Sequence, residues 1–175
     1  MKAIVCKEFG PPSALVLEEM EPLSPKKNEI LIDIHAAGVN FPDTLIIKDM
    51  YQFKPALPFT PGNEVAGIVS AVGEEVTNYK VGDEVMAMPP FGGYAEQIIA
   101  TPSQVSKKPA NMDFATAACF STTYGTSHYG LKDKAKLKEG ETVLILGASG
   151  GVGISAIEIA KAMGAKVIAA ASTDE

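Results

Sequence analysis

Residues 142–153, TVLILGASGGVG, decide the fold of the C-terminal part of this 175-residue chain. A short run of apolar and β-branched residues predicts a strand, and it leads directly into a segment rich in glycine. The residues from Gly150 to Met163 predict a helix that ends at Gly164. The run Lys166–Ala171 predicts a second apolar strand. This order is typical of a strand–helix–strand unit with two buried parallel strands.

The predicted helix has one apolar face, which we expect to be buried against these strands. The residues of this face share a helical spacing and are Val152, Ala156, Ile159, Ala160 and Met163. One such unit cannot cover both faces of its own sheet, and a doubly wound domain needs several more strands. We therefore expect the sequence to be the N-terminal portion of a longer protein, or a natural truncation.

The glycine segment between strand and helix predicts a dinucleotide site. Glycines let the backbone turn sharply and approach a pyrophosphate, while the helix N-terminus offers free N–H groups and partial positive charge. The candidate binding residues are Ala148, Ser149, Gly150, Gly151, Val152 and Gly153. The alternative is a tight structural turn. The segment lacks the Gly-Lys-Ser/Thr of a P-loop, and the chain lacks the Tyr-x-x-x-Lys pair of short-chain dehydrogenases.

The first 110 or so residues predict an all-β domain. Short runs rich in Val, Ile and Leu alternate with Pro and Gly turns, which is typical of a small barrel or sandwich. The predicted strands are 2–7, 14–19, 29–39, 65–72, 84–88 and 94–100. In one of them Ile30, Ile32 and Ile34 alternate with Leu31, Asp33 and His35. After this region we expect Asn111 to cap a helix that begins at Asp113.

Composition narrows the possible partners. The 21 acidic residues outnumber the 15 lysines and there is no arginine, which gives a net charge of −6 and argues against a nucleic-acid partner. No apolar run approaches the ~20 residues of a membrane span, and no secretory signal opens the chain. The two cysteines, Cys6 and Cys119, are too few for a disulfide framework. We expect a cytoplasmic protein.

Several motifs together resemble the medium-chain dehydrogenase/reductases, in particular their zinc-free NADPH:quinone oxidoreductase (zeta-crystallin-like) branch. The motifs are GVNFPD (38–43), PGNEVAG (61–67), VGDEV (81–85), GGYAE (92–96), YGT (124–126) and the glycine segment. The resemblance implies a β plus α/β fold, in which a GroES-like β-barrel domain over 1–120 precedes the first βαβ unit of a Rossmann domain over 121–175. It also implies an active site between the domains and a homodimer in the full-length form.

The resemblance implies an enzyme without zinc. Zinc alcohol dehydrogenases of this superfamily carry Cys where Asn40 stands, His where Asn63 stands, and Cys near Ala118. Asparagine and alanine are poor or impossible zinc ligands, and one thiolate cannot hold the metal. We expect Glu64 to serve no metal, and Cys119 to be a small buried apolar residue.

Without zinc, hydride transfer suits a conjugated C=C–C=O acceptor, whose developing enolate oxygen needs a hydrogen-bond donor. The resemblance implies Tyr51 as that donor; the alternative is a loop tyrosine packed against neighbouring apolar residues. It implies that Asn40 orients the nicotinamide or the substrate, that Thr126 contacts the nicotinamide carboxamide, and that His128 lines the pocket. Asp43 is expected to be structural, accepting nearby backbone N–H groups.

The end of the second predicted strand favours NADP(H) over NAD(H). It carries no carboxylate for the ribose 2′-hydroxyl, whereas the Ser172 and Thr173 hydroxyls suit a 2′-phosphate. Asp174, slightly later, could instead fill the NAD role.

Three functions stay open at this point. The first is an NADPH-dependent reductase of small-molecule quinones or enones. The second is an enoyl-thioester (enoyl-CoA or acyl-carrier) reductase. The third is a truncated chain that acts only as a binding or subunit-interaction module, since we expect residues 1–175 alone to be inactive.

Overall fold

The computed structural model describes residues 1–172, and these divide into two compact units, the first ending at Cys119 and the second beginning at Phe120. Thr173 and Asp174, two residues of the cofactor prediction, lie outside the described range. Of the helices in the described range, none combines the length and apolar character needed to cross a bilayer.

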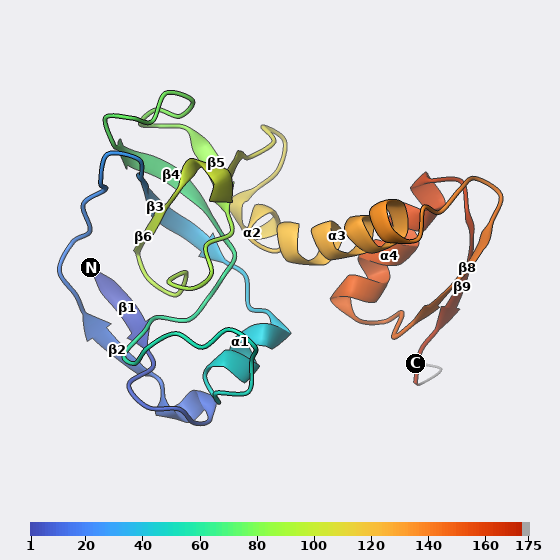
Figure 1. The fold of residues 1–175 in the computed structure, drawn as a ribbon, viewed down its shortest axis with the longest axis horizontal. Helices are drawn as coiled ribbons and strands as arrows, with labels where there is room; N and C mark the ends of the chain where they lie inside the picture. The colour runs from blue at the N-terminus through green and yellow to red at the C-terminus, as the bar shows by residue number, and fades with distance from the viewer. Residues whose placement is uncertain (173–175) are drawn as a thin grey trace. The chain divides into compact units, whose positions relative to one another are not determined.

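The first unit is built on a five-stranded antiparallel sheet, which confirms the all-β prediction (Figure 1). In spatial order its strands are β6 (Gln97–Ala100), β3 (Ile30–Ala37), β4 (Val65–Val72), β5 (Glu84–Ala87) and β7 (Val105–Lys107). A separate hairpin pairs β1 (Lys2–Val5) with β2 (Val16–Glu19), and the short helices are α1 (Phe41–Ile46) and α2 (Phe114–Ala117).

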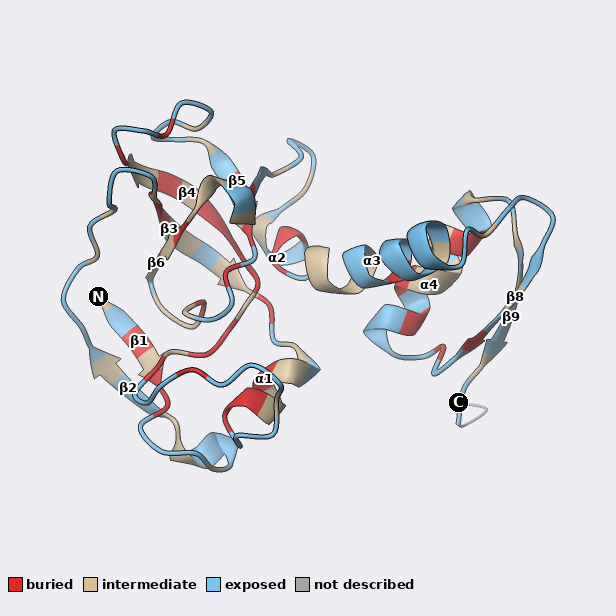
Figure 2. Cartoon of the chain, viewed as in Figure 1, coloured by how far each residue is buried: buried red, intermediate tan, exposed pale blue. Residues whose placement is uncertain are grey.

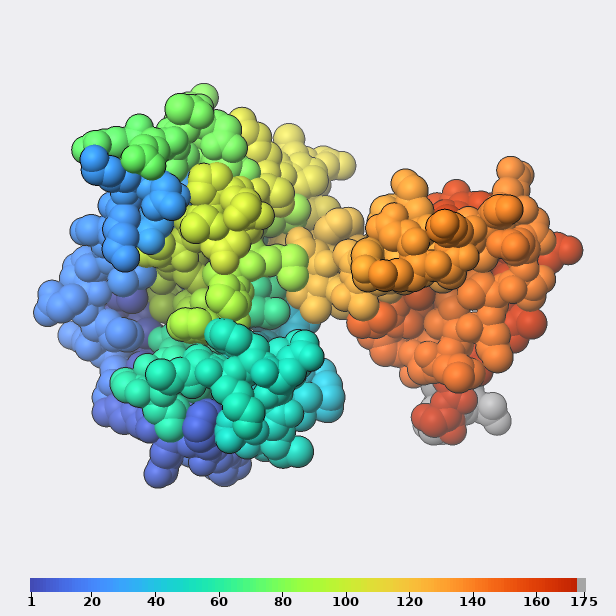
Figure 3. Space-filling model, in the orientation of Figure 1, coloured from blue at the N-terminus to red at the C-terminus, as the bar shows by residue number. Residues whose placement is uncertain are grey.

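The core of this unit lies along β3 and β4, where the first three residues of each strand are buried (Figure 2). Ile30 and Ile32 are fully buried, as the alternation predicts, and Asp33 lies on the opposite side of the strand. Leu31 is also buried, at 7% exposure, so the face that carries Asp33 and His35 is partly covered too. A second apolar cluster joins Cys6, just after β1, to the end of α1 and to Phe59. The blue segment that follows β1 lies against the teal segment that follows α1 in the space-filling view (Figure 3).

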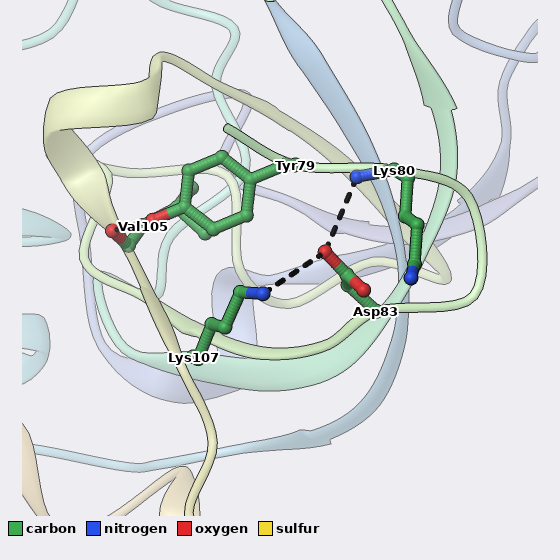
Figure 4. Close-up of polar contacts among 5 residues, drawn as sticks. All are labelled: Tyr79, Lys80, Asp83, Val105 and Lys107. Carbon is green, nitrogen blue, oxygen red and sulfur yellow. Dashed lines mark hydrogen bonds and ion pairs between the residues drawn. The ribbon is translucent and has the colours of Figure 1, made fainter. Parts of the chain in front are cut away.

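Polar contacts join the turn before β5 to β7 at the edge of the sheet (Figure 4). The Tyr79 hydroxyl donates to the Val105 carbonyl at 2.6 Å, and Asp83 accepts the Lys80 backbone N–H at 3.2 Å. Lys107 lies 3.8 Å from the same carboxylate and is largely exposed, so its ion pair contributes little.

Helix α2 corrects one prediction. Its N-cap is Asp113, not Asn111, because the Asp113 carboxylate accepts both the backbone N–H of Thr116 at 2.8 Å and its hydroxyl at 3.0 Å. These hydrogen bonds lower the pKa of Asp113.

The second unit contains the predicted strand–helix–strand order. Its elements are α3 (Ser121–His128), a π-type turn (Tyr129–Lys134), β8 (Thr142–Leu146), α4 (Gly151–Ala162) and β9 (Lys166–Ala170). Strands β8 and β9 are parallel: Thr142 pairs with Lys166 at one end and Leu146 pairs with Ala170 at the other. This pairing confirms the predicted parallel unit.

The burial within this unit differs from the prediction. Only Ile145 of β8 is buried, while Leu144, Leu146 and Ile168 are 57%, 74% and 55% exposed. Helix α4 packs on both strands, and among residues 1–172 no further strand or helix covers these three side chains. Val152, predicted on the buried face of α4, is also exposed.

Candidate functional site

The first candidate site lies where β3 leads into α1. Asn40 is the N-cap of α1, and its backbone N–H donates to the Asp43 carboxylate at 2.8 Å. Its side-chain Nδ2 donates to Oε2 of Glu64 at 3.0 Å. Glu64 is buried at 1% exposure, whereas Asn40 is half-buried. The sequence prediction for Asp43 is therefore confirmed, and the Asn40–Glu64 bond is a contact that sequence reasoning did not find.

Tyr94 completes the support of this turn. Its hydroxyl donates to Oδ2 of Asp43 at 2.7 Å, so the buried carboxylate of Asp43 accepts from two partners. Burial and, secondarily, the bond to Asp43 and its negative charge raise the pKa of Tyr94. Asp43 and Tyr94 therefore fix the backbone from which the Asn40 side chain projects.

This arrangement predicts that Asp43→Ala lowers the stability of the first unit by about 2–3 kcal/mol, because the Tyr94 hydroxyl and the Asn40 backbone N–H, both partly buried, lose their acceptor. Denaturant unfolding measures the change. Asp43→Asn keeps one acceptor oxygen and is expected to lose less. Equal stability of Asp43→Ala and the unchanged protein would contradict the role given to the carboxylate.

A close backbone approach brings Ala118 to the same place. The Gly38 N–H donates to the Glu64 carbonyl at 2.9 Å, and a Cβ at Gly38 would lie 2.2 Å from the Ala118 carbonyl oxygen and 3.2 Å from Glu64 Oε2. The positions of Asn40 and Ala118, where zinc-dependent relatives carry ligands, are thus brought together around Glu64.

The donors at these positions do not suit a metal. In the described part of the chain, no three His, Cys, Asp or Glu side chains lie close enough to hold a metal ion. The Oδ1 of Asn63 is buried and has no hydrogen-bond partner there. Cys119 is exposed, so the prediction that it is buried was wrong; Cys6 is the buried cysteine. Cys119 lies directly before the second unit begins, beyond the buried Ala117 and Ala118.

Tyr51 lies after the turn that follows α1. Its half-buried ring packs against a cluster formed by Cys6, Ile46, Ile47 and Phe59. Among residues 1–172, none provides the Tyr51 hydroxyl with a hydrogen-bond partner. The ring therefore has a packing role.

The second candidate site is the turn from β8 into α4. Gly147 has a φ of +67°, in the left-handed region that favours glycine, and its carbonyl accepts the Gly150 N–H at 3.1 Å. The Ala148 N–H donates to the Ala170 carbonyl at 3.0 Å, which ties the turn to the end of β9. Ala148 is buried, whereas Ser149 and Gly150 are exposed.

Two glycines of this turn are present for different reasons. A Cβ at Gly153 would lie 2.2 Å from the Gly147 carbonyl oxygen and 2.8 Å from the Ala148 Cα, so the turn itself has no room for a side chain. A Cβ at Gly150 would meet only the Gly147 oxygen, at 3.5 Å, which is ordinary contact. The space at Gly150 is therefore left open by the fold. The first N–H groups of α4 have no acceptor within the helix, so the turn fits an anionic phosphate group.

Helix α3 packs on the start of α4 through small polar residues. The buried hydroxyls of Ser127 and Ser155 lie 2.8 Å apart, and both donate to the Val152 carbonyl at 2.9 Å. This contact explains why α4 buries Gly153 and Ser155 and leaves Val152 exposed: small residues let the two helices approach. The two serines were missed in the sequence because serine in a helix carries no periodic apolar signal.

The predicted residues around this turn are placed as follows. Thr126 is exposed on α3, next to the buried Ser127 whose hydroxyl donates to the Val152 carbonyl. His128 lines a hollow of about 300 Å³ with Phe120, Tyr124, Gly125 and Ile159. Ser172 is exposed beyond β9, while Thr173 is not described.

Comparison with known proteins gives consistent matches. A family model described as the alcohol dehydrogenase GroES-like domain matches residues 26–110. Quinone oxidoreductase from Sus scrofa is 45% identical over 177 residues, which cover 100% of this chain and 54% of that protein.

Solved structures give the same result. Quinone oxidoreductase from Escherichia coli in complex with NADPH matches with a TM-score of 0.94 and 35% identity, over 99% of this chain and 53% of that one. The CurK enoyl reductase matches with a TM-score of 0.88 and 36% identity, over 98% and 53%. The chain therefore spans about half the length of the proteins it matches.

Proposed function

Because this chain belongs to the medium-chain dehydrogenase/reductases, in their quinone oxidoreductase branch, we propose that the protein transfers hydride from NADPH to a quinone or an α,β-unsaturated carbonyl. Its first unit is a GroES-like domain and its second corresponds to the start of a Rossmann domain. The observation that carries the proposal is the glycine turn before α4. A side chain would fit at Gly150, so the fold itself does not require glycine there, and its absence leaves space for a ligand.

The glycine turn would hold the pyrophosphate of the dinucleotide. The backbone of residues 148–153 and the free N–H groups of α4 supply donors, and the helix dipole favours the negative charge. When bound, the reduced nicotinamide supplies the hydride. On the side of the adenosine, Ser172 and Thr173 are proposed to receive a 2′-phosphate, which favours NADP(H) over NAD(H). Residues 166–172 contain no carboxylate that would repel it.

The acceptor would be polarised by a hydrogen bond in place of a metal. We assign this donor to the Tyr51 hydroxyl, and we assign the positioning of the nicotinamide to Asn40 and Thr126. Asn40 already donates its amide to Glu64, and Asn63 and Ala118 offer no anionic or imidazole ligand, which supports a reaction without zinc.

An enoyl-thioester reductase is the second candidate. It is favoured by the likeness to the CurK enoyl reductase. Both candidates add hydride to a conjugated carbonyl, so they differ in the group attached to it. A homodimer in the cytoplasm stays a prediction for the whole protein, to be checked by light scattering and cell fractionation.

The direct test is NADPH oxidation by the protein as its gene encodes it, against quinones, simple enones and enoyl-CoA esters, with and without a chelator. We expect turnover of at least one class, preference for NADPH over NADH, and no loss of rate with the chelator. Turnover of enoyl-CoA alone would favour the second candidate. Binding without turnover of any acceptor would favour a binding module and contradict the proposed function.

A further inference from the structure

The Asn40 side chain is an amide, and its function depends on which way round the amide lies. Nδ2 is a donor and Oδ1 an acceptor, and the two ends exchange places when the group turns over. A ligand beside Asn40 therefore meets a donor or an acceptor according to that orientation.

Glu64 determines the orientation. Its Oε2 lies 3.0 Å from Nδ2 of Asn40, and a carboxylate can only accept, so the donor end of the amide must face it. Glu64 is 1% exposed and cannot exchange this partner for bulk water at low cost. The Asn40 backbone is fixed separately by Asp43, which is itself held by Tyr94. The amide thus has one arrangement, with Oδ1 on the side away from Glu64, where it faces the Asp43 backbone N–H in the capping box of α1 and keeps a second lone pair for a ligand.

We infer that Glu64 is a positioning residue, which turns the Asn40 amide so that Oδ1 is the acceptor for an N–H donor of the bound cofactor. This inference rests on the proposed function, because in that function Asn40 contacts the nicotinamide. The nicotinamide end carries one such donor, the N–H₂ of its carboxamide. An enolate oxygen needs a hydrogen-bond donor, so an acceptor at Asn40 does not stabilise it, and that role stays with Tyr51.

The experiment compares the binding of NADPH with that of its 3-acetylpyridine analogue, in which a methyl group replaces the carboxamide N–H₂. One hydrogen bond predicts that the unchanged protein binds NADPH about tenfold more tightly than the analogue. In Glu64→Gln the amide at 64 can donate or accept, so Asn40 can turn over, and the ratio is expected to fall to about two. Thermal unfolding checks that the variant is folded.

The matched control is Glu96→Gln, the same substitution at an exposed carboxylate that accepts the Lys2 N–H at 2.8 Å; its ratio should equal that of the unchanged protein. If Glu64→Gln does not fold, Glu64→Asp withdraws the carboxylate by one methylene and is expected to lower the ratio likewise. A ratio near one in the unchanged protein, or an unaltered ratio in the Glu64 variants, overturns the inference while the proposed function stands. Failure to bind either dinucleotide overturns both.

Discussion

Gly153→Ala is expected to destabilise the second unit by about 3 kcal/mol and to abolish dinucleotide binding. The added Cβ would lie 2.2 Å from the Gly147 carbonyl oxygen, and this neighbour is backbone rather than a flexible side chain. The turn before α4 must therefore open, which displaces the N–H groups that would contact phosphate. Denaturant unfolding and calorimetric titration with NADPH measure the two effects.

Gly150→Ala is the matched control three residues earlier. The added Cβ would make ordinary contact only, and the φ of −81° suits alanine. Because alanine allows the unfolded chain fewer conformations than glycine, the stability of the variant should be equal or slightly higher. Cofactor affinity should still fall, because the methyl group occupies the position that the fold leaves open. Normal NADPH affinity in Gly150→Ala would show that the segment is only a structural turn, and normal stability of Gly153→Ala would refute the steric argument.

Tyr51→Phe is expected to lower turnover of an enone or quinone by about 10²–10³-fold, with a much smaller change in KM. The phenylalanine ring can keep the packing against Ile46, Ile47 and Phe59, so only the hydroxyl is removed. Its hydrogen bond matters most when negative charge develops on the carbonyl oxygen. Steady-state kinetics with saturating NADPH measures the effect.

Tyr79→Phe separates catalysis from stability. The Tyr79 hydroxyl donates to the Val105 carbonyl, so its removal should lower stability by about 1 kcal/mol and leave turnover unchanged. Tyr51→Phe should show the opposite pattern. Equal turnover of Tyr51→Phe and the unchanged protein would assign Tyr51 to packing alone.

Local sequence patterns determined the elements and their order. The apolar run 142–146, the glycine segment and the run after Gly164 predicted β8, α4 and β9 nearly to the residue, because strand period and helix signals depend on near neighbours. Asp43 was likewise expected to accept nearby backbone N–H groups, and it accepts that of Asn40. Motif resemblance indicated the family.

Tertiary structure alone decided which atoms meet. The bond from Asn40 to Glu64 spans 24 positions and the contact of Ser127 with Ser155 spans 28, and no local period encodes either pair. The same reason accounts for the errors at Val152 and Cys119, since burial depends on which element packs against a residue. It also separates Gly150 from Gly153: the sequence shows two equivalent glycines, and only the folded turn shows that one is required by the backbone while the other leaves room for a ligand.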